Sequence, residues 1–238
     1  MRTGVNIGGA EALALKGALL VYEGRRDSFV SWHQVRTATE GGAPFLGEAE
    51  PLTTDFLRAL AAGLGSRVSP EVLSPNILVR TPETLVWWTR PQHRTMFFSE
   101  PSEAGRSLNG KRYPHPPLVF KTSGTQLWVR ALTKDARPTA DTKLKTAPYW
   151  NTNDQGYVCL GTMRTPEDDG IESVQVWERG FFQSEFTHAY GAARLTSFPG
   201  GFVALWKHLA GSSRAFPVKY LTDSRQTLRE FVEERLSP

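Results

Sequence analysis

Two hydrophobic patterns follow one another in the first part of the chain. Residues 14–22 (ALKGALLVY) form an apolar run that ends in the turn sequence EGRRD, and Phe29–Val35 alternates, so the two runs predict a β-hairpin. A loop rich in Gly and Pro comes next. Residues 53–65 then predict a helix that Thr53 or Thr54 can cap and Gly65 can end, with an apolar face formed by Phe56, Leu57, Leu60 and Leu64.

Short antiparallel strands are the dominant prediction for the middle of the chain. Residues 76–99 contain the runs NILVR, TLVWWT and TMFFS, separated by the turn sequences TPE and RPQHR, which is typical of a meander. Leu118–Lys121 and Gln126–Leu132 add two strand candidates. Asp135–Pro148 is predicted as a long loop that leads towards Cys159.

After Cys159 the hydrophobic period becomes helical. Thr165 can cap a helix with Pro166 at its first position, and the apolar face would hold Ile171, Val174, Trp177, Phe181 and Phe182. A second helix fits Phe202–Leu209, and a third after Asp223 would bury Leu228, Phe231, Val232 and Leu236. Strands followed by helices predict an α+β fold, with a hairpin and helix elaboration at residues 1–66 packed on a core domain at residues 67–238.

Composition narrows the function only modestly. The net charge of +4 comes from scattered Lys and Arg residues, whereas nucleic-acid binders concentrate such charge, so we expect no nucleic-acid partner. An ordinary basic surface explains this charge, and an acidic protein partner is the alternative explanation. No apolar run approaches the roughly 20 residues that cross a bilayer, and the N-terminus is a poor signal peptide, so we expect a cytoplasmic protein without a membrane partner.

The single cysteine excludes an internal disulfide and a multi-thiolate metal site. The five histidines have no paired metal-ligand spacing, so neither a metal nor another cofactor is expected. Residues 105–111 (GRSLNGK) match the start of a phosphate-binding loop, but Arg112 stands where Ser or Thr is required. By residue type alone, Cys159 is more typical of a small buried hydrophobe than of a nucleophile.

The segment Tyr149–Gly161 (YWNTNDQGYVCLG) changes that balance. It resembles the active-site loop of ubiquitin-conjugating enzymes, which reads His-Pro-Asn, seven residues and then cysteine. Tyr149 and Trp150 take the His-Pro places, Asn151 takes the asparagine place and Cys159 the nucleophile place. The chain is identified as a member of a prokaryotic branch, UBC family D, which includes PRTRC system protein B. The segments that carry this resemblance are PLTTDFLRALAAGLG, TLVWWT, YPHPPLVF, ADTKLKTAPYWNTNDQGYVCLG and WERGFFQSEFTH.

The resemblance implies a UBC-like antiparallel meander with an active-site loop followed by helices. It also implies that Cys159 carries a ubiquitin-like modifier as a thioester, for which the thiolate is the reactive form. The positive end of the helix predicted near Thr165 would favour that thiolate. Asn151 either stabilises the oxyanion of the transfer step or braces the loop. His188, which would take the place of a histidine that marks this branch, either acts on the amine or thiol or is structural.

Three neighbouring residues are candidate substrate contacts. Tyr149 and Trp150 either meet the substrate or pack the loop, and Asp154 is either a weak base or a solvated acid. The partners implied by the resemblance are a ubiquitin-like modifier, a ThiF-type activating enzyme and a JAB-type metalloprotease, in a mobile-element or antiphage system. Two other functions are kept open: a catalytically inert binding module of the same fold, and a Cys-His hydrolase that uses Cys159 and His188.

Overall fold

The structure is a computed structural model in which the chain forms two compact units, Met1–Glu71 and Val72–Pro238. Each unit is described by itself, and the predicted packing of residues 1–66 on the core stays a prediction. The residues described are 15–24, 28–37, 43–63, 72–81, 84–100, 102–161, 163–166, 170–190 and 194–234.

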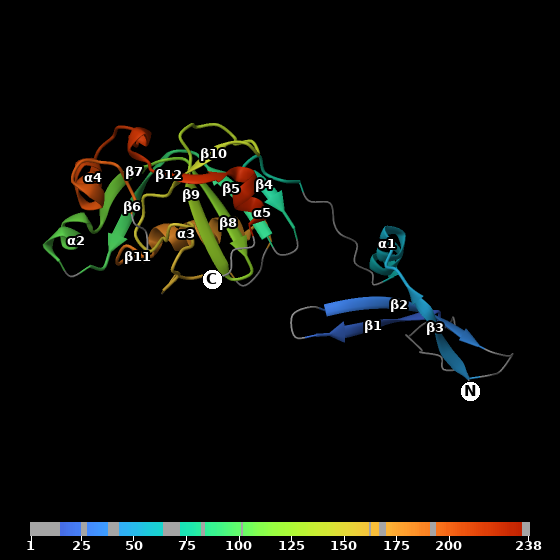
Figure 1. Cartoon of the computed structure of the whole chain (residues 1–238). Helices are drawn as coiled ribbons and strands as arrows, with labels where there is room; N and C mark the ends of the chain where they lie inside the picture. Colours follow the sequence, from blue (N-terminus) through green and yellow to red (C-terminus); the bar gives the residue numbers. More distant parts are fainter. Residues whose placement is uncertain are drawn as a thin grey trace. The chain divides into compact units, whose positions relative to one another are not determined.

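The N-terminal unit is a three-stranded antiparallel sheet with one helix (Figure 1). Strands β1 (Gly17–Glu23) and β2 (Ser28–Thr37) form the predicted hairpin. Strand β3 (Pro44–Glu50) lies where a loop was predicted. The prediction missed this strand because the sequence PFLGEAE has few of the apolar residues that signal one. Thr53 caps α1 (Thr54–Gly63) by accepting a hydrogen bond from the Phe56 backbone at 3.2 Å, whereas the predicted helix end at Leu64 and Gly65 lies outside the described residues.

The second unit is built on a six-stranded antiparallel sheet in the order β12-β10-β9-β8-β5-β4 (Figure 1). Four of its strands were predicted: β4 (Ile77–Arg80), β5 (Thr84–Thr89), β8 (Leu118–Ser123) and β9 (Gln126–Ala131). Two were missed: β10 (Lys143–Thr146), inside the predicted long loop, and β12 (Asp223–Thr227), where only a helix was expected. Both missed strands are short and rich in polar residues, so they lack an apolar pattern.

A second, smaller sheet corrects the predicted meander. Strand β6 (Gln92–Phe98) leaves the main sheet and pairs instead with β7 (Lys111–His115) across α2 (Glu103–Leu108). Its place beside β5 is taken by β8, which pairs with β5 over six consecutive residues. The two-residue β11 (Glu185–Phe186) joins the other edge of β6 in parallel.

The helix prediction after Cys159 is right in its buried face and wrong in its start. Helix α3 (Ser173–Gln183) buries Val174, Trp177, Phe181 and Phe182 as predicted. Residues 163–166 are not helical, so Thr165 does not cap this helix. Helix α4 (Gly201–Leu209) lies where it was predicted, followed by the short 3-10 helix η1 (Val218–Tyr220). Helix α5 (Leu228–Glu233) begins with a capping box between Thr227 and Glu230, and the predicted Leu236 lies outside the described residues.

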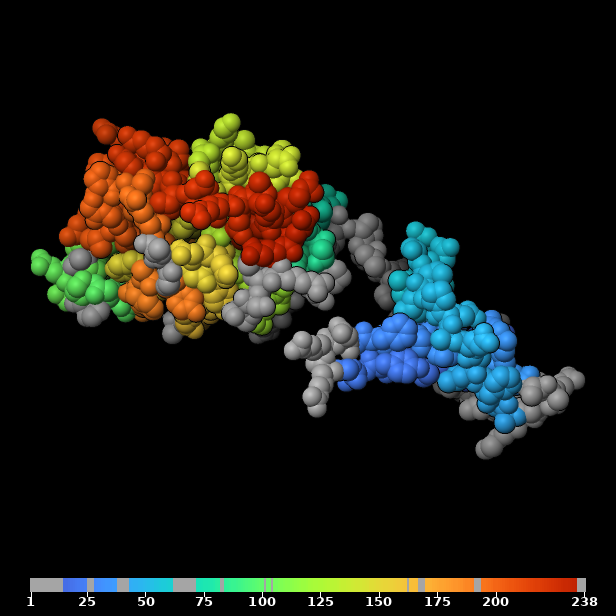
Figure 2. Space-filling view, viewed as in Figure 1, coloured from blue at the N-terminus to red at the C-terminus, as the bar shows by residue number. Residues whose placement is uncertain are grey.

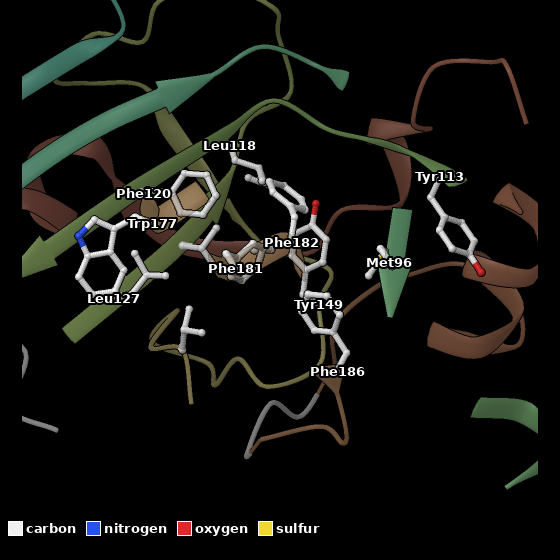
Figure 3. Packing of buried hydrophobic residues seen from close by; sticks show 14 of the residues in the cluster. Met96, Tyr113, Leu118, Phe120, Leu127, Tyr149, Trp177, Phe181, Phe182 and Phe186 are labelled. Atoms are coloured by element: carbon white, nitrogen blue, oxygen red, sulfur yellow. The ribbon is translucent and has the colours of Figure 1, made fainter. Parts of the chain in front are cut away.

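Both faces of the main sheet are covered. On one face, Trp87 stacks on Phe120 at a ring-centroid distance of 5.2 Å, and aromatic residues of α4 belong to the same larger core. Phe120 shares this core with Trp177, Phe181 and Phe182 of α3 (Figure 3). On the other face, Val86, Trp88 and Trp128 pack against Leu228 and Phe231 of α5. The red C-terminal segment in Figure 2 lies over this face beside the teal residues of β4. The architecture is therefore α+β, as predicted. None of the described helices combines the length and the apolar character that a membrane crossing requires.

Candidate functional site

The loop that carries Cys159 pairs with the part of the β9 edge that β10 leaves uncovered. In its pairing with β9, strand β10 reaches only the last two residues of that strand, Arg130 and Ala131. The loop takes the remaining edge: the Val129 amide donates to the carbonyl of Gly156 at 2.8 Å, and the Val158 amide donates to the carbonyl of Leu127 at 2.9 Å. A segment outside the named strands is thereby paired with β9 through backbone hydrogen bonds, as an added strand would be.

The tip of the loop is fixed by the side chain of Asn153 and by the buried Arg130. Asn153 Oδ1 accepts from the backbone amides of Gln155 and Tyr157 at 3.0 and 2.9 Å, which closes the turn. Arg130 is almost fully buried and donates to the Asp154 carbonyl at 2.9 Å, while Gln226 Oε1 takes its other two bonds. Burial lowers the pKa of Arg130 to about 10.

Asn151 joins two segments that are distant in the sequence. Its backbone amide donates to the carbonyl of His188, and its carbonyl accepts from the Cys159 amide, both at 2.8 Å. Asn151 has a φ of 60°, in the left-handed region that asparagine tolerates better than most residues. The backbone of Asn151 therefore places the cysteine segment and the histidine segment on either side of one residue.

The side chain of Asn151 also joins the loop to the segment before His188. Its Nδ2 donates to the Glu185 carbonyl at 2.8 Å, and its Oδ1 accepts from the amide and the hydroxyl of Thr187 at 3.0 and 2.9 Å. Because these bonds engage both ends of the amide, the geometry favours the bracing interpretation of Asn151 over a free oxyanion donor.

Cys159 is half-buried. Its neighbours Val158 and Leu160 pack into or against the core, which leaves the cysteine between two anchored residues. Within the described residues, no hydrogen bond to its sulfur is present. The helix end expected near Thr165 is not found, because α3 begins at Ser173, and the proposed helix-dipole effect on the thiol loses its basis.

His188 is exposed, next to the strand β11 that Asn151 braces. Its Nδ1 shares a hydrogen bond of 2.8 Å with the hydroxyl of Thr187, and its ring centroid lies 6.3 Å from that of Tyr190. No hydrogen bond links His188 to Cys159 in the part of the chain that is described. The two residues belong to segments that meet at Asn151, which makes His188 a candidate for the site through position and not through direct contact.

Tyr149 lies inside the core, which favours the interpretation that it packs the loop. Its side chain has no exposed surface, and its ring packs against Phe181 and Phe186 with centroid distances of 5.2 and 5.9 Å (Figure 3). Its hydroxyl shares a hydrogen bond of 2.9 Å with Nδ1 of the buried His115. Burial raises the pKa of Tyr149 well above its ordinary value and lowers the pKa of His115 to about 3, so both groups are neutral inside the core.

The two other candidate substrate contacts lie nearer to the surface. Trp150 is half-buried, stacks on Phe202 at 4.6 Å and lines a hollow of about 450 Å³ with Arg194 and Phe198. Asp154 is exposed at the tip of the loop. No group of three or more His, Cys, Asp and Glu side chains is arranged to hold a metal ion within the described ranges.

Three residues that support the cysteine loop were not predicted from the sequence. Arg130 lies in an apolar run, QLWVRAL, where a charged residue inside a strand candidate was the available signal. Gly156 has a φ of 81°, and a Cβ there would lie 2.7 Å from the Val129 carbonyl. His115 belongs to the YPHPP sequence that helped to carry the resemblance.

The antiparallel main sheet, the loop with the cysteine beside β9 and the helices that follow are consistent with the class of E2-like, ubiquitin-conjugating-enzyme-like proteins. The sequence profile of prokaryotic E2 family D matches residues 54–224, and the chain belongs to that family. The matched region runs from the start of α1 into β12 and includes the whole cysteine loop. Comparisons with curated proteins and with solved structures give no significant match. Interaction with a modifier and an activating enzyme is what an E2-like family implies in general.

Proposed function

We propose that this protein is a transferase that accepts a ubiquitin-like modifier as a thioester on Cys159 and passes it to an amine. In the first step the Cys159 thiolate attacks the thioester carbonyl of the loaded activating enzyme, and the thiolate of that enzyme leaves. In the second step an amine nitrogen attacks the new thioester, the bond to Cys159 breaks, and the amine loses a proton.

One observation carries the proposal: the only cysteine is half-buried on a loop whose backbone is fixed to β9 and to Asn151. A carrier has to present its sulfur in one orientation to two successive protein partners, and a fixed loop lowers the entropic cost of each encounter.

The surrounding residues take different roles in this proposal. Asn151 is a positioning residue, because its bonds hold the cysteine segment against residues 185–188. His188 is exposed and is the candidate group for accepting the proton of the incoming amine. Asp154 and Trp150 offer surface on the two sides of the loop to the bound partners.

The test is a charging assay with the activating enzyme, the modifier and ATP. We expect an adduct that thiol reductant removes, that disappears in Cys159→Ala, and that Cys159→Ser replaces with a reductant-stable ester. Lys143→Ala, an exposed residue on β10, serves as the matched control and should charge normally. Failure of the folded protein to charge alongside its own partner enzymes would refute the thioester function.

A binding module without catalysis is the second candidate. It is favoured by the sulfur of Cys159, which has no hydrogen-bond partner within the described residues, and by the engaged amide of Asn151. A module of this kind would bind the modifier or the activating enzyme equally well as Cys159→Ala and would show no adduct. Isothermal titration of both forms with the uncharged modifier tests the binding, and the absence of a reductant-sensitive adduct in the charging assay separates this function from the transferase.

The cellular setting is also a proposal. The ThiF-type activating enzyme, the JAB-type metalloprotease and a role in a PRTRC or antiphage system rest on resemblance to the family, and a cytoplasmic location rests on the sequence-based expectation alone. Co-purification of the tagged protein from its native host, in the presence and absence of Cys159, would test these partners.

A further inference from the structure

A basic hollow adjoins the cysteine loop on the side of α3. Its cavity volume is about 680 Å³, and it lies between the segment after Cys159 and the second half of α3. Its lining includes Met163, Arg164, Val176, Arg179, Gly180 and Glu185. We refer to it as the Arg164–Arg179 hollow.

Gly180 sets the shape of this hollow. A Cβ at this position would lie 2.6 Å from the carbonyl oxygen of Arg164 and 3.2 Å from Cγ of Met163. The backbone of α3 therefore approaches the post-cysteine segment as closely as only glycine allows. This contact holds Arg164 beside the helix that carries Arg179.

The described lining residues of the hollow carry an excess of positive charge. Arg164 and Arg179 are both exposed, and neither forms an ion pair within the described residues, whereas Glu185 is the one carboxylate among the lining residues named above. The nearby acid of α3, Glu178, is turned away: it binds Arg94 at 3.0 Å and the indole nitrogen of Trp87 at 3.2 Å. Val176, 40% exposed, adds an apolar contact surface to the same stretch of helix.

Both walls of the hollow are tied directly to the site. The amide of Met163 donates to the carbonyl of Leu160, the residue after Cys159, at 2.7 Å. On the other wall, the carbonyl of Glu185 accepts from Asn151 Nδ2 at 2.8 Å. A chain bound in the hollow would therefore lie next to the cysteine loop.

We propose that the Arg164–Arg179 hollow binds an acidic segment of the amine acceptor, a specificity that rests on the proposed transferase function. The modifier is held to Cys159 by a covalent bond, but the acceptor arrives by diffusion and has to be oriented. Acidic side chains on both sides of a lysine would pair with the two arginines and bring the amine to the thioester. Charge complementarity of this kind selects partners and speeds their encounter.

Binding can be tested without any transfer. Full-length Cys159→Ser is titrated, by fluorescence anisotropy, with a labelled peptide that has one lysine flanked by two glutamates on each side, and with the same peptide carrying glutamines. We expect the glutamate peptide to bind at least about 10-fold more tightly, and the double variant Arg164→Gln/Arg179→Gln to remove this preference. Raising the salt to about 0.5 M should weaken the glutamate peptide selectively.

Arg214→Gln is the matched control for charge, because Arg214 is exposed and does not line the hollow. Equal binding of the two peptides, or an equal loss of preference in Arg214→Gln, would overturn the proposal. A circular dichroism melt of each variant confirms that it is folded before binding is compared.

Charging assays separate this inference from the proposed function. We expect Arg164→Gln/Arg179→Gln to charge at the wild-type rate and to discharge more slowly onto the glutamate peptide. Loss of charging without loss of peptide preference would mean that the hollow meets the activating enzyme, which overturns the assignment to the acceptor. Arginine-dependent binding in a protein that never charges would refute the transferase and support the acidic docking surface.

Discussion

The backbone carbonyl of Asn151 accepts a hydrogen bond of 2.8 Å from the backbone amide of Cys159. The same residue donates its backbone amide to the His188 carbonyl and its Nδ2 to the Glu185 carbonyl, and its Oδ1 accepts from Thr187. One asparagine thus fixes the cysteine relative to the strand β11 and the histidine that follows it. The site depends on this residue for its geometry, whichever chemistry the sulfur performs.

Asn151→Ala should reduce stability and slow both halves of the transfer. It removes three side-chain hydrogen bonds and places an alanine at a φ of 60°, at a combined cost of about 2–4 kcal/mol in the free energy of unfolding. Asn151→Gly, which tolerates this φ, should lose about 1 kcal/mol less. Urea denaturation and single-turnover charging and discharge measure these effects. Slower discharge alone, with unchanged stability, would restore the oxyanion role.

Gly156→Ala should damage the loop through a backbone collision. The new Cβ would meet the Val129 carbonyl at 2.7 Å and the guanidinium of Arg130 at 3.2 Å. We expect a loss of about 3 kcal/mol or more in the free energy of unfolding, from the left-handed φ and the collision together. Gly124→Ala is the matched control, because Gly124 also has a positive φ but no atom within 4 Å of its Cβ position, and it should lose only about 1–2 kcal/mol. Similar losses in the two variants would contradict the collision.

His115 should make the fold sensitive to mild acid. Burial lowers the pKa of His115 to about 3 in the folded protein, whereas a histidine in an unfolded chain has a pKa of about 6.5. As the pH falls below about 6.5, protons therefore bind preferentially to the unfolded chain. Between pH 7 and pH 5 this histidine should remove about 2 kcal/mol from the free energy of unfolding. His115→Gln keeps a hydrogen-bonding group opposite Tyr149 and should lack this dependence. An identical pH profile for both proteins, measured by urea denaturation, would argue against a neutral buried His115.

Lys121 should anchor the C-terminal helix. This buried side chain donates to the carbonyls of Phe231, Val232 and Glu234, at 2.9, 3.2 and 2.8 Å. Lys121→Met should cost about 1–3 kcal/mol of stability and should increase amide hydrogen exchange throughout α5. The exposed Lys143→Met should change stability by no more than about 0.5 kcal/mol. Unchanged exchange in α5 would show that packing of Leu228 and Phe231 alone holds the helix.

Much of the secondary structure could be read from hydrophobic periodicity. The strands at β4, β5, β8 and β9 and the buried face of α3 follow from alternating or helical spacing of large apolar residues. Strands β3, β10 and β12 have no such spacing, and they exist because a neighbouring strand offers a free edge. A signal based on burial cannot detect a strand that is stabilised mainly by backbone hydrogen bonds.

The sequence alone determined the α+β class and the family, because each depends on residue identity and local spacing, and it singled out Cys159 as the candidate acyl carrier. Only the tertiary structure decided that β6 pairs with β7 and not with β5, that Tyr149 faces the core, and that Asn151 connects Cys159 to His188. These outcomes depend on which segments compete for the same strand edge or the same interior volume. That competition is settled between residues far apart in the chain, where local patterns carry no information.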